Sequence, residues 1–372
     1  MSVIVNPNVL DLIPYKPGKP VEELQREFNL EKVVKLASNE NPAGVSKKVS
    51  AAITKEIANI NLYPESDSYY VKKRIAEYNG VDMENVIVGA GSVEIIRMII
   101  KAFLKPGETV LSSEKTFVFY KIAALEEGGK KAYIEAPMGD DYTFDLDAMY
   151  KLIDNHTKII FITNPNNPTG TMIPKHKILE FIGKVPEDKL IVLDNAYQEY
   201  VEKPGNHLNG IDEALNRKNI IVLRTFSKIY ALSGLRVGYA ISNGEIISYL
   251  NRVKAPFNLS RLSQVAAYAS LEDDSFKIKS FSRNLKNKRK LFKQLNETGW
   301  GWRVIPTEAN FIMFIPTVDI AVLDWRLLRE GVIIRPLQGF GAPEAMRVTV
   351  GFEEENDFFI EKLKKVMSEI GK

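Results

Sequence analysis

Short apolar runs alternate with amphipathic stretches between about residue 46 and residue 255. Within these runs nearly every position is apolar, which is typical of strands that helices cover on both faces. The expected strands lie at residues 86–88, 109–112, 131–135, 158–163, 190–194 and 220–223.

Apolar positions with helical spacing separate these strands. The expected helices lie at residues 93–103, 117–127, 146–152 and 175–183. Strands and helices that alternate in this way predict an α/β fold with a mainly parallel central sheet and helices on both faces. A further strand at 237–241 follows too closely for a crossover helix, so we expect it to pair antiparallel.

The pattern changes near residues 255–257. The later helices are expected at 263–271, 276–295, 320–330 and 354–368, and the later strands at 302–304, 311–315, 332–335 and 346–350. We therefore expect a large domain over residues 46–255 and a smaller α+β domain over 256–372. Residues 1–45 are rich in Pro, Asn and Gly, which predicts an extended arm that joins the small domain and contains one short helix at 21–28.

Composition narrows the class of protein. The 372 residues are 45% apolar and 26% charged, as in ordinary globular proteins, and 50 basic residues nearly match 47 acidic ones. This balance gives no case for nucleic acid as a partner. No apolar run approaches the roughly 20 residues of a membrane helix, and the N-terminus does not resemble a signal peptide. We expect a cytoplasmic protein without a membrane partner.

Cysteine is absent, which excludes disulfides and thiolate nucleophiles. The three histidines, His156, His176 and His207, are scattered along the chain, so we expect no metal site.

Lys228 is the first candidate for chemistry. It follows the apolar run 220–223, and Arg236 stands between glycines shortly after it. An amine at the end of a strand forms a Schiff base with an aldehyde once its pKa is lowered. The hydroxyls of Thr225 and Ser227 and the guanidinium of Arg236 suit a phosphate next to it. The alternative is a surface lysine after a buried strand.

Polar residues also follow two other strands. Residues 164–170 read Asn-Pro-Asn-Asn-Pro-Thr-Gly, which is either a simple turn or a ligand loop at the carboxyl end of a parallel strand. Asn167 in this loop can donate to a phenolate or a carboxylate. Asp194 is either a helix cap or a carboxylate that keeps a pyridine ring cationic. Tyr197 can bond the phenolic oxygen of such a ring, or it is a core aromatic.

Residues 89–94 read Gly-Ala-Gly-Ser-Val-Glu and join a strand to a helix, where backbone N–H groups bind phosphate. Glu94 replaces the third glycine of a dinucleotide fingerprint, and no ribose-binding acid ends the next strand. The turn therefore indicates a phosphate site at Gly91 and Ser92, with a nicotinamide site as the alternative.

Arg347 lies within the apolar strand expected at 346–350, where an unpaired cation is costly to bury. It therefore indicates an anionic ligand, or else a salt bridge to a nearby acid. Arg335 repeats this pattern at the end of the strand expected at 332–335.

The ordered motifs Asn-Asn-Pro-Thr-Gly, Asp-x-Ala-Tyr, Ser-Lys, Gly-Leu-Arg-x-Gly and Arg-x-Thr-Val-Gly resemble those of the fold-type I aminotransferases, which use pyridoxal 5'-phosphate. The resemblance covers nearly the whole chain. Within this group, residues 14–20, 35–42 and 62–64 are most similar to the class II histidinol-phosphate aminotransferases.

The resemblance implies roles for these residues. Lys228 would hold the cofactor as a Schiff base and move a proton between substrate and cofactor carbons. Asp194 would pair with the ring nitrogen, Phe117 would stack on the ring, and Asn167 and Tyr197 would bond the ring oxygen. The cofactor phosphate would be held by Gly91, Ser92, Thr225, Ser227 and Arg236.

The resemblance also implies a homodimer, because Tyr63 would reach the cofactor phosphate of the neighbouring subunit. Arg347 would bind the anionic end of each substrate, with Asn167 nearby, and Tyr15 and Arg335 would add donors for a substrate phosphate.

Three positions depart from the family pattern. Asn195 replaces a common Glu, Phe117 a common Tyr, and Val93 a common Asp. Phe117 still stacks but cannot hydrogen-bond. The cup around Gly91 should keep its function, because backbone N–H groups bind much of the phosphate.

The function implied is transamination between L-histidinol phosphate and 2-oxoglutarate, a step of L-histidine biosynthesis. An aromatic amino-acid aminotransferase would share every cofactor residue, and a phosphothreonine decarboxylase most of them. Alternatives from other classes are a nicotinamide-dependent enzyme and a non-catalytic dimer of the same fold.

Overall fold

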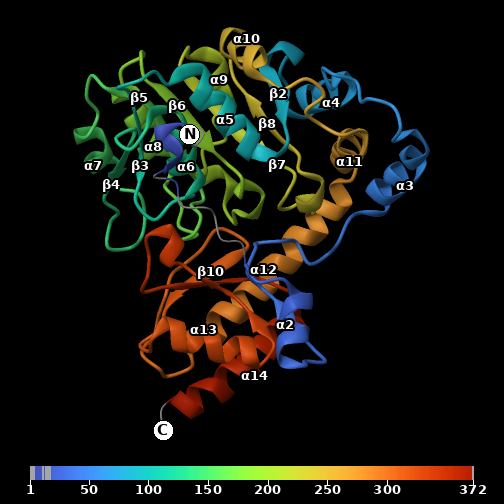
Figure 1. Cartoon of the computed structure of the whole chain (residues 1–372), viewed down its shortest axis with the longest axis vertical. Helices are drawn as coiled ribbons and strands as arrows, with labels where there is room; N and C mark the ends of the chain where they lie inside the picture. The colour runs from blue at the N-terminus through green and yellow to red at the C-terminus, as the bar shows by residue number, and fades with distance from the viewer. Residues whose placement is uncertain (1–4, 11, 13–17, 371–372) are drawn as a thin grey trace, which may run out of the picture.

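The computed structural model describes residues 5–10, 12 and 18–370 and contains a large and a small body (Figure 1). The large body is built on a seven-stranded sheet in the order β2-β8-β7-β6-β5-β3-β4. Its strands are β2 (Val86–Gly89), β3 (Thr109–Ser113), β4 (Tyr133–Ala136), β5 (Thr157–Thr163), β6 (Leu190–Asp194), β7 (Ile220–Thr225) and β8 (Gly238–Ile241).

Strand directions bring the candidate residues to one edge of this sheet. β4, β3, β5, β6 and β7 run parallel, whereas β8 runs antiparallel between β7 and β2, as its short connection predicts. Because β8 is reversed relative to both neighbours, β2 runs parallel to β7. The carboxyl ends of β2, β5, β6 and β7 therefore meet at the same edge.

Helices cover both faces of the sheet. One face packs on α5 (Gly91–Phe103), α6 (Phe119–Gly128) and α10 (Gly244–Val253). The other face packs on α7 (Leu146–Lys151), α8 (Lys175–Lys184) and α9 (Ile211–Asn216). Alternate residues of β5 enter the two cores: Ile159 and Phe161 the first, Ile160 and Ile162 the second. The expected α/β class with a mainly parallel sheet is confirmed.

Further helices flank the β2 end of the sheet. They are α3 (Lys47–Glu56), α4 (Tyr69–Asn79) and α11 (Arg261–Leu271), and α11 packs against the other two. The short 3-10 helices are η1 (Ile57–Asn59), η2 (Met83–Asn85), η3 (Gln198–Tyr200), η4 (Pro204–Asn206), η5 (Ser233–Leu235) and η6 (Gln338–Phe340). Every helix within the described residues is too short or too polar to span a lipid bilayer.

The small body contains an antiparallel sheet in the order β12-β13-β10-β9. Its strands are β9 (Arg303–Val304), β10 (Phe311–Ile315), β12 (Arg335–Pro336) and β13 (Met346–Thr349). The helices α12 (Asp274–Asn296), α13 (Ile320–Arg329) and α14 (Glu353–Ile370) share one apolar core with this sheet.

The expectation of a single strand at 332–335 is wrong. The segment divides into β11 (Val332–Ile333) and β12, which belong to different sheets. β11 pairs in parallel with β1 (Val34–Lys35), because the Val34 N–H donates to the Gly331 carbonyl at 2.8 Å. Two residues later the chain pairs with β13 instead. The partner of β11 comes from the N-terminal segment, which the local pattern does not reveal.

The N-terminal segment also contains more structure than expected. The helix predicted at 21–28 is present as α2 (Val21–Phe28), but α1 (Pro7–Leu10) precedes it. The Nδ2 of Asn8 in α1 donates to the carbonyls of Glu126 and Glu127 at the end of α6, at 3.4 and 3.3 Å. The prediction of only one helix in residues 1–45 is therefore wrong.

The junction of β1 and β11 depends on Gly331. Its φ is +79°, and an added Cβ would collide with the Lys32 carbonyl oxygen. We expect Gly331→Ala to lower the apparent Tm of the apoprotein by at least about 2 °C, because the left-handed conformation alone costs a non-glycine residue about 1–2 kcal/mol. Gly339→Ala is the matched control, since open space surrounds its Cβ position. Equal Tm values for the two variants would contradict this account.

Candidate active site

A cavity of about 240 Å³ opens at the sheet edge where the four strands end. It brings together residues from β6, β7, the loop after β5 and the start of α5, as the positions of their strands predict. The predicted site residues that line it are Ser92, Phe117, Asn167, Asp194, Tyr197, Thr225, Ser227, Lys228 and Arg236.

The environment of the Lys228 amine favours its neutral form. Burial lowers its pKa to about 8, and the positive charges of Arg347 and Arg236 act in the same direction, whereas Glu40 opposes them. About a tenth of the amine is therefore neutral at pH 7, far more than for a lysine with the usual pKa of about 10.4, and the neutral form is the nucleophile. This environment differs from that of a surface lysine.

Asp194 is a buried carboxylate held by two hydrogen bonds. Its Oδ2 accepts from the Tyr120 hydroxyl at 2.6 Å, and its Oδ1 accepts from the Ala196 N–H at 3.1 Å. Burial raises its pKa, and both hydrogen bonds oppose this shift by stabilising the charged form. The next helix, η3, has Tyr197 at its cap position, so Asp194 does not cap it.

Tyr120 belongs to none of the sequence motifs described above. It is fully buried on α6, its hydroxyl also lies 2.8 Å from Thr163 Oγ1, and its ring stacks on Phe161 with centroids 4.2 Å apart. The only signal in the sequence is its helical spacing from Phe117, three residues earlier, which places both rings on one side of the turn.

Asn167 and Tyr197 are both bonded to other parts of the site. The Nη1 of Arg347 donates to Asn167 Oδ1, and the Nδ2 of Asn39 donates to the Tyr197 hydroxyl at 3.0 Å. Lys228 Nζ lies 5.6 Å from the centroid of the Tyr197 ring. The Tyr197 ring also packs in the hydrophobic core, so Tyr197 can be a core aromatic and still present its hydroxyl to a ligand.

A hydrogen bond from His207, which follows η4, anchors the loop 164–170. His207 Nε2 lies 2.9 Å from the Asn164 carbonyl oxygen. Burial lowers the pKa of His207 to about 4, so the ring is neutral and its Nε2–H donates this bond. The loop also contains cis peptide bonds before Pro165 and Pro168.

Gly91, Ser92 and Arg236 form a cradle at the start of α5. Gly91 has φ +76°, and a Cβ there would overlap the Arg236 guanidinium. Arg236 Nη1 donates to Ser227 Oγ at 3.3 Å, and the Ser227 N–H donates to Thr225 Oγ1 at 3.1 Å. A helix N-terminus, a guanidinium and two hydroxyls therefore converge as an anion site requires.

Arg347 and Arg335 lie opposite each other on the neighbouring strands β13 and β12. Arg347 is buried, and its Nη2 donates to the Ala37 carbonyl at 2.9 Å. Both guanidinium groups lie over the Phe340 ring, at 5.5 and 5.7 Å from its centroid. Asp324 faces Arg335, and burial raises the pKa of this carboxyl to about 6 while Arg335 opposes the shift.

Gly91, Arg335 and Arg347 are not among the residues that line the cavity, and Tyr63 does not join it either. Tyr63 is 80% exposed, and its ring stacks on Phe257 with centroids 4.8 Å apart. Exposed Ile60 and Leu62 precede it, so it belongs to an apolar surface. Tyr15 lies outside the described residues.

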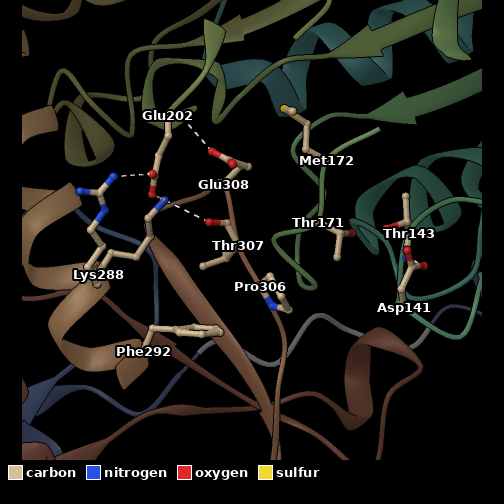
Figure 2. A pocket seen from close by; sticks show the side chains of 11 residues that line it. Asp141, Thr143, Thr171, Met172, Glu202, Lys288, Phe292, Pro306, Thr307 and Glu308 are labelled. Carbon is tan, nitrogen blue, oxygen red and sulfur yellow. Dashed lines mark hydrogen bonds and ion pairs between the residues drawn. The ribbon is translucent and has the colours of Figure 1, made fainter. Parts of the chain in front are cut away.

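A second, larger hollow of about 520 Å³ lies between α12, the segment before β10 and the loops after β5 and η3 (Figure 2). Within this hollow, Lys288 Nζ contacts Glu202 Oε1 at 3.2 Å and donates to the Thr307 carbonyl at 3.0 Å. No predicted site residue lines this hollow.

The family description "aminotransferase class I and II" matches residues 31–363. The chain belongs to this family. Membership of this family agrees with the observed fold and with the lowered pKa of Lys228, which follows β7.

Relatives within the class I and II aminotransferases refine this placement. The chain is 43% identical to the histidinol-phosphate aminotransferase of Anaeromyxobacter sp. (strain Fw109-5), over 98% of this chain and 99% of that one. It is 41% identical to the same enzyme of Akkermansia muciniphila, over 97% and 98% of the two chains. The fold matches that of the Sinorhizobium meliloti histidinol-phosphate aminotransferase, solved with pyridoxal-5'-phosphate, with a TM-score of 0.88 at 23% identity over 98% of both chains.

The lowered pKa of Lys228 predicts how this aminotransferase apoprotein reacts with an aldehyde. Because the pKa is about 8, the neutral fraction of the amine rises roughly tenfold between pH 7 and pH 9 and levels off above it. The rate at which pyridoxal phosphate and borohydride label Lys228, followed by peptide mass spectrometry, should rise in parallel. A rate that rises about a hundredfold between pH 7 and pH 9 and keeps rising above pH 10 would show an unperturbed lysine.

Proposed function

We propose that this aminotransferase uses pyridoxal 5'-phosphate to transfer the amino group of L-histidinol phosphate to 2-oxoglutarate. The products are imidazole-acetol phosphate and glutamate, so the enzyme acts in L-histidine biosynthesis. The observation that carries the proposal is the cavity around Lys228, because it collects the cofactor residues implied by the sequence in a chain whose relatives are histidinol-phosphate aminotransferases.

The residues present fit the cofactor. A phosphate fits the cradle at Gly91, where a side chain would collide with Arg236. Asp194 would hold the ring nitrogen, Asn167 and Tyr197 the ring oxygen, and Phe117 one face of the ring. Ser92, Thr225, Ser227 and Arg236 would hold the phosphate, and Lys228 the carbonyl carbon.

When bound, pyridoxal phosphate supplies a carbonyl that takes up the substrate amino group and a cationic ring that withdraws electrons from the substrate carbon. The Lys228 Nζ, with a pKa near 8, would take the proton from the substrate carbon that carries the amino group and would deliver it to the cofactor carbon. The Asp194 carboxylate would hold a proton on the ring nitrogen. Burial raises its pKa, and the hydrogen bond from Tyr120 opposes this shift by stabilising the charged form.

Arg347 would bind an anionic group of each substrate in turn. Its guanidinium already contacts Asn167 and the Ala37 carbonyl, so a substrate anion bound there would lie beside the ring-oxygen residues. One arginine can serve both half-reactions, since glutamate and histidinol phosphate are both anions. Arg335, on the adjacent strand, and Tyr15 would add donors for the substrate phosphate.

The alternative functions differ in how well the residues of the site agree with them. An aromatic amino-acid aminotransferase would use the same cofactor residues, so only substrate preference separates it from the proposed enzyme. A phosphothreonine decarboxylase would share most of them. A nicotinamide site at residues 89–94 is disfavoured, because the Glu94 carboxylate accepts from the Ala90 N–H inside the turn. A non-catalytic dimer would have no need of a lysine with a lowered pKa.

We also propose a homodimer in which Tyr63 reaches the cofactor phosphate of the partner. The exposed apolar side chains around Tyr63 support it, since such a patch marks an interface. They are Ile57, Ile60, Leu62, Tyr69, Tyr70 and Phe257. We further propose residues 46–255 as the large domain, and residues 256–372 with the arm 1–45 as the small one.

Substrate preference tests the proposed function. With 2-oxoglutarate as acceptor, kcat/KM for histidinol phosphate should exceed that for phenylalanine and tyrosine by at least about tenfold, because the arginine pair offers charge-assisted hydrogen bonds to a phosphate. Lys228→Ala protein should bind the cofactor without transamination. A larger kcat/KM for the aromatic amino acids would favour the aromatic aminotransferase.

Light scattering and cofactor affinity test the dimer. The measured mass should be twice the 42.0 kDa of one chain. Tyr63→Phe should raise the dissociation constant of pyridoxal phosphate about three- to tenfold, because it removes one hydrogen bond to a charged group. Tyr70→Phe is the matched control, since Tyr70 is also an exposed tyrosine and loses the same hydroxyl. A monomer, or equal effects of both substitutions, would contradict the proposed dimer.

A further inference from the structure

Glu40 is an acidic residue of the N-terminal segment that lines the cavity around Lys228. Its side chain is 46% exposed, so a ligand that enters the cavity can reach the carboxylate. Among the described residues that line this cavity, the other acidic residue is Asp194, which is bonded to Tyr120 and suits the cofactor ring nitrogen. Glu40 is therefore the carboxylate that faces the space left for a substrate.

The segment that carries Glu40 passes beside the Lys228 amine. The carbonyl of Ser38 accepts from Lys228 Nζ at 3.3 Å, and Ser38 lines the cavity as well. Glu40 is near enough for its negative charge to act on the pKa of Lys228. The substrate carbon that gives up its proton must approach this amine. Glu40 therefore lies close to the groups that are attached to that carbon.

Contacts on both sides hold the backbone of Glu40 in place. The Nδ2 of Asn310 donates to the carbonyl of Asn39, the residue before it, at 3.0 Å. The Nδ2 of Asn41, the residue after it, donates to the Ile229 carbonyl at 2.9 Å. Because Ile229 directly follows Lys228 in the chain, these contacts keep the carboxylate at a fixed place relative to the reactive amine.

Histidinol phosphate has three polar groups, namely an amino group, a phosphate and an imidazole ring. Under the proposed function the amino group reacts with the cofactor and the phosphate is bound by arginines, so the ring still needs a partner. An imidazole has at least one N–H donor, and its pKa of about 6.5 makes it partly cationic near neutral pH. A carboxylate accepts this hydrogen bond, most strongly from the cationic ring.

We propose that Glu40 is a specificity-determining residue that accepts a hydrogen bond from the imidazole ring of the amino donor. This inference rests on the proposed function, because that function supplies the imidazole. Glutamate has a second carboxylate in place of the ring, and Glu40 repels that group. Glu40 therefore favours the half-reaction with histidinol phosphate and gives no advantage to the half-reaction with glutamate.

Two lysines act on the Glu40 carboxylate. Lys35 Nζ lies 3.5 Å from Glu40 Oε2, and both side chains of this ion pair are partly exposed. Lys228 is the second cation, through its interaction with the Glu40 charge. The remaining charged groups line the cavity or act on Lys228; they are Asp194, Arg236 and Arg347. Both half-reactions use the same amine, so the ratio of their rates cancels any change in Lys228 itself.

Glu40→Gln tests the proposal, because it keeps the shape of the side chain and removes the charge. The two half-reactions are followed separately by stopped-flow absorbance of the bound cofactor. The ratio of the rate constant for histidinol phosphate to that for glutamate should fall about tenfold at pH 6, where the ring is mostly cationic. The fall should be smaller at pH 8, where the ring is neutral and the amide oxygen can still accept.

Binding gives a second measurement that does not depend on turnover. In a Lys228→Ala background that contains the cofactor, Glu40→Gln should raise the dissociation constant of histidinol phosphate about tenfold at pH 6, since one charge-assisted hydrogen bond is lost. The dissociation constant of glutamate should not rise. Equal changes for both ligands would overturn the proposal.

Lys35→Met is the matched control. It removes the ion-pair partner of Glu40 and leaves the carboxylate in the cavity, so the ratio of the two half-reactions should stay within about twofold of the wild-type ratio. If Lys35→Met lowers the ratio as much as Glu40→Gln does, the carboxylate only holds the segment, and the proposal is wrong. An unchanged ratio in Glu40→Gln would also overturn it.

These outcomes are distinct from failure of the proposed function. If wild-type protein transaminates aromatic amino acids and not histidinol phosphate, the proposed function is wrong and the role of Glu40 fails with it. If wild-type protein prefers histidinol phosphate and Glu40→Gln keeps that preference at both pH values, the function stands and only the role of Glu40 is wrong.

Discussion

Reversal of a single strand determines where the chemistry is placed. β8 runs antiparallel between β2 and β7, so β2 points in the same direction as the parallel strands and α5 begins beside the end of β7. Gly238 makes this possible, because a Cβ there would lie 2.5 Å from the Ser92 nitrogen. The helix N-terminus and Arg236 can then share one anion site. Lys228 is placed next to that site because it follows directly on β7.

Burial shifts the pKa values of the two main ionisable groups at this edge, Lys228 and Asp194. Burial lowers the pKa of Lys228 and raises that of Asp194, so both groups shift toward the neutral form. Hydrogen bonds from Tyr120 and Ala196 partly restore the charged form of Asp194. In the same cavity, burial therefore lowers the pKa of the amine and raises that of the carboxylate, and the hydrogen bonds to Asp194 limit the second shift.

The sequence predicts those parts of the site that follow directly on strands. Lys228, Asp194 and the loop with Asn167 each come straight after an apolar run, and parallel strands bring such positions together. The contacts of Asn39 with Tyr197 and of Tyr120 with Asp194 could not be predicted, because they join residues 158 and 74 positions apart in the chain. The division between β11 and β12 was missed for the same reason, since β1 comes from the N-terminal segment.

The carboxylate of Glu94 has a consequence for discrimination among phosphorylated molecules. Its Oε2 accepts from the Ala90 N–H and from Asn258 Nδ2, so a negative charge is fixed inside the turn that opens α5. The turn therefore offers its free N–H groups to one phosphate and opposes a second anionic group beside it. A dinucleotide would bring its second phosphate toward this carboxylate, whereas a ligand with a single phosphate would not, so this one side chain would discriminate between them.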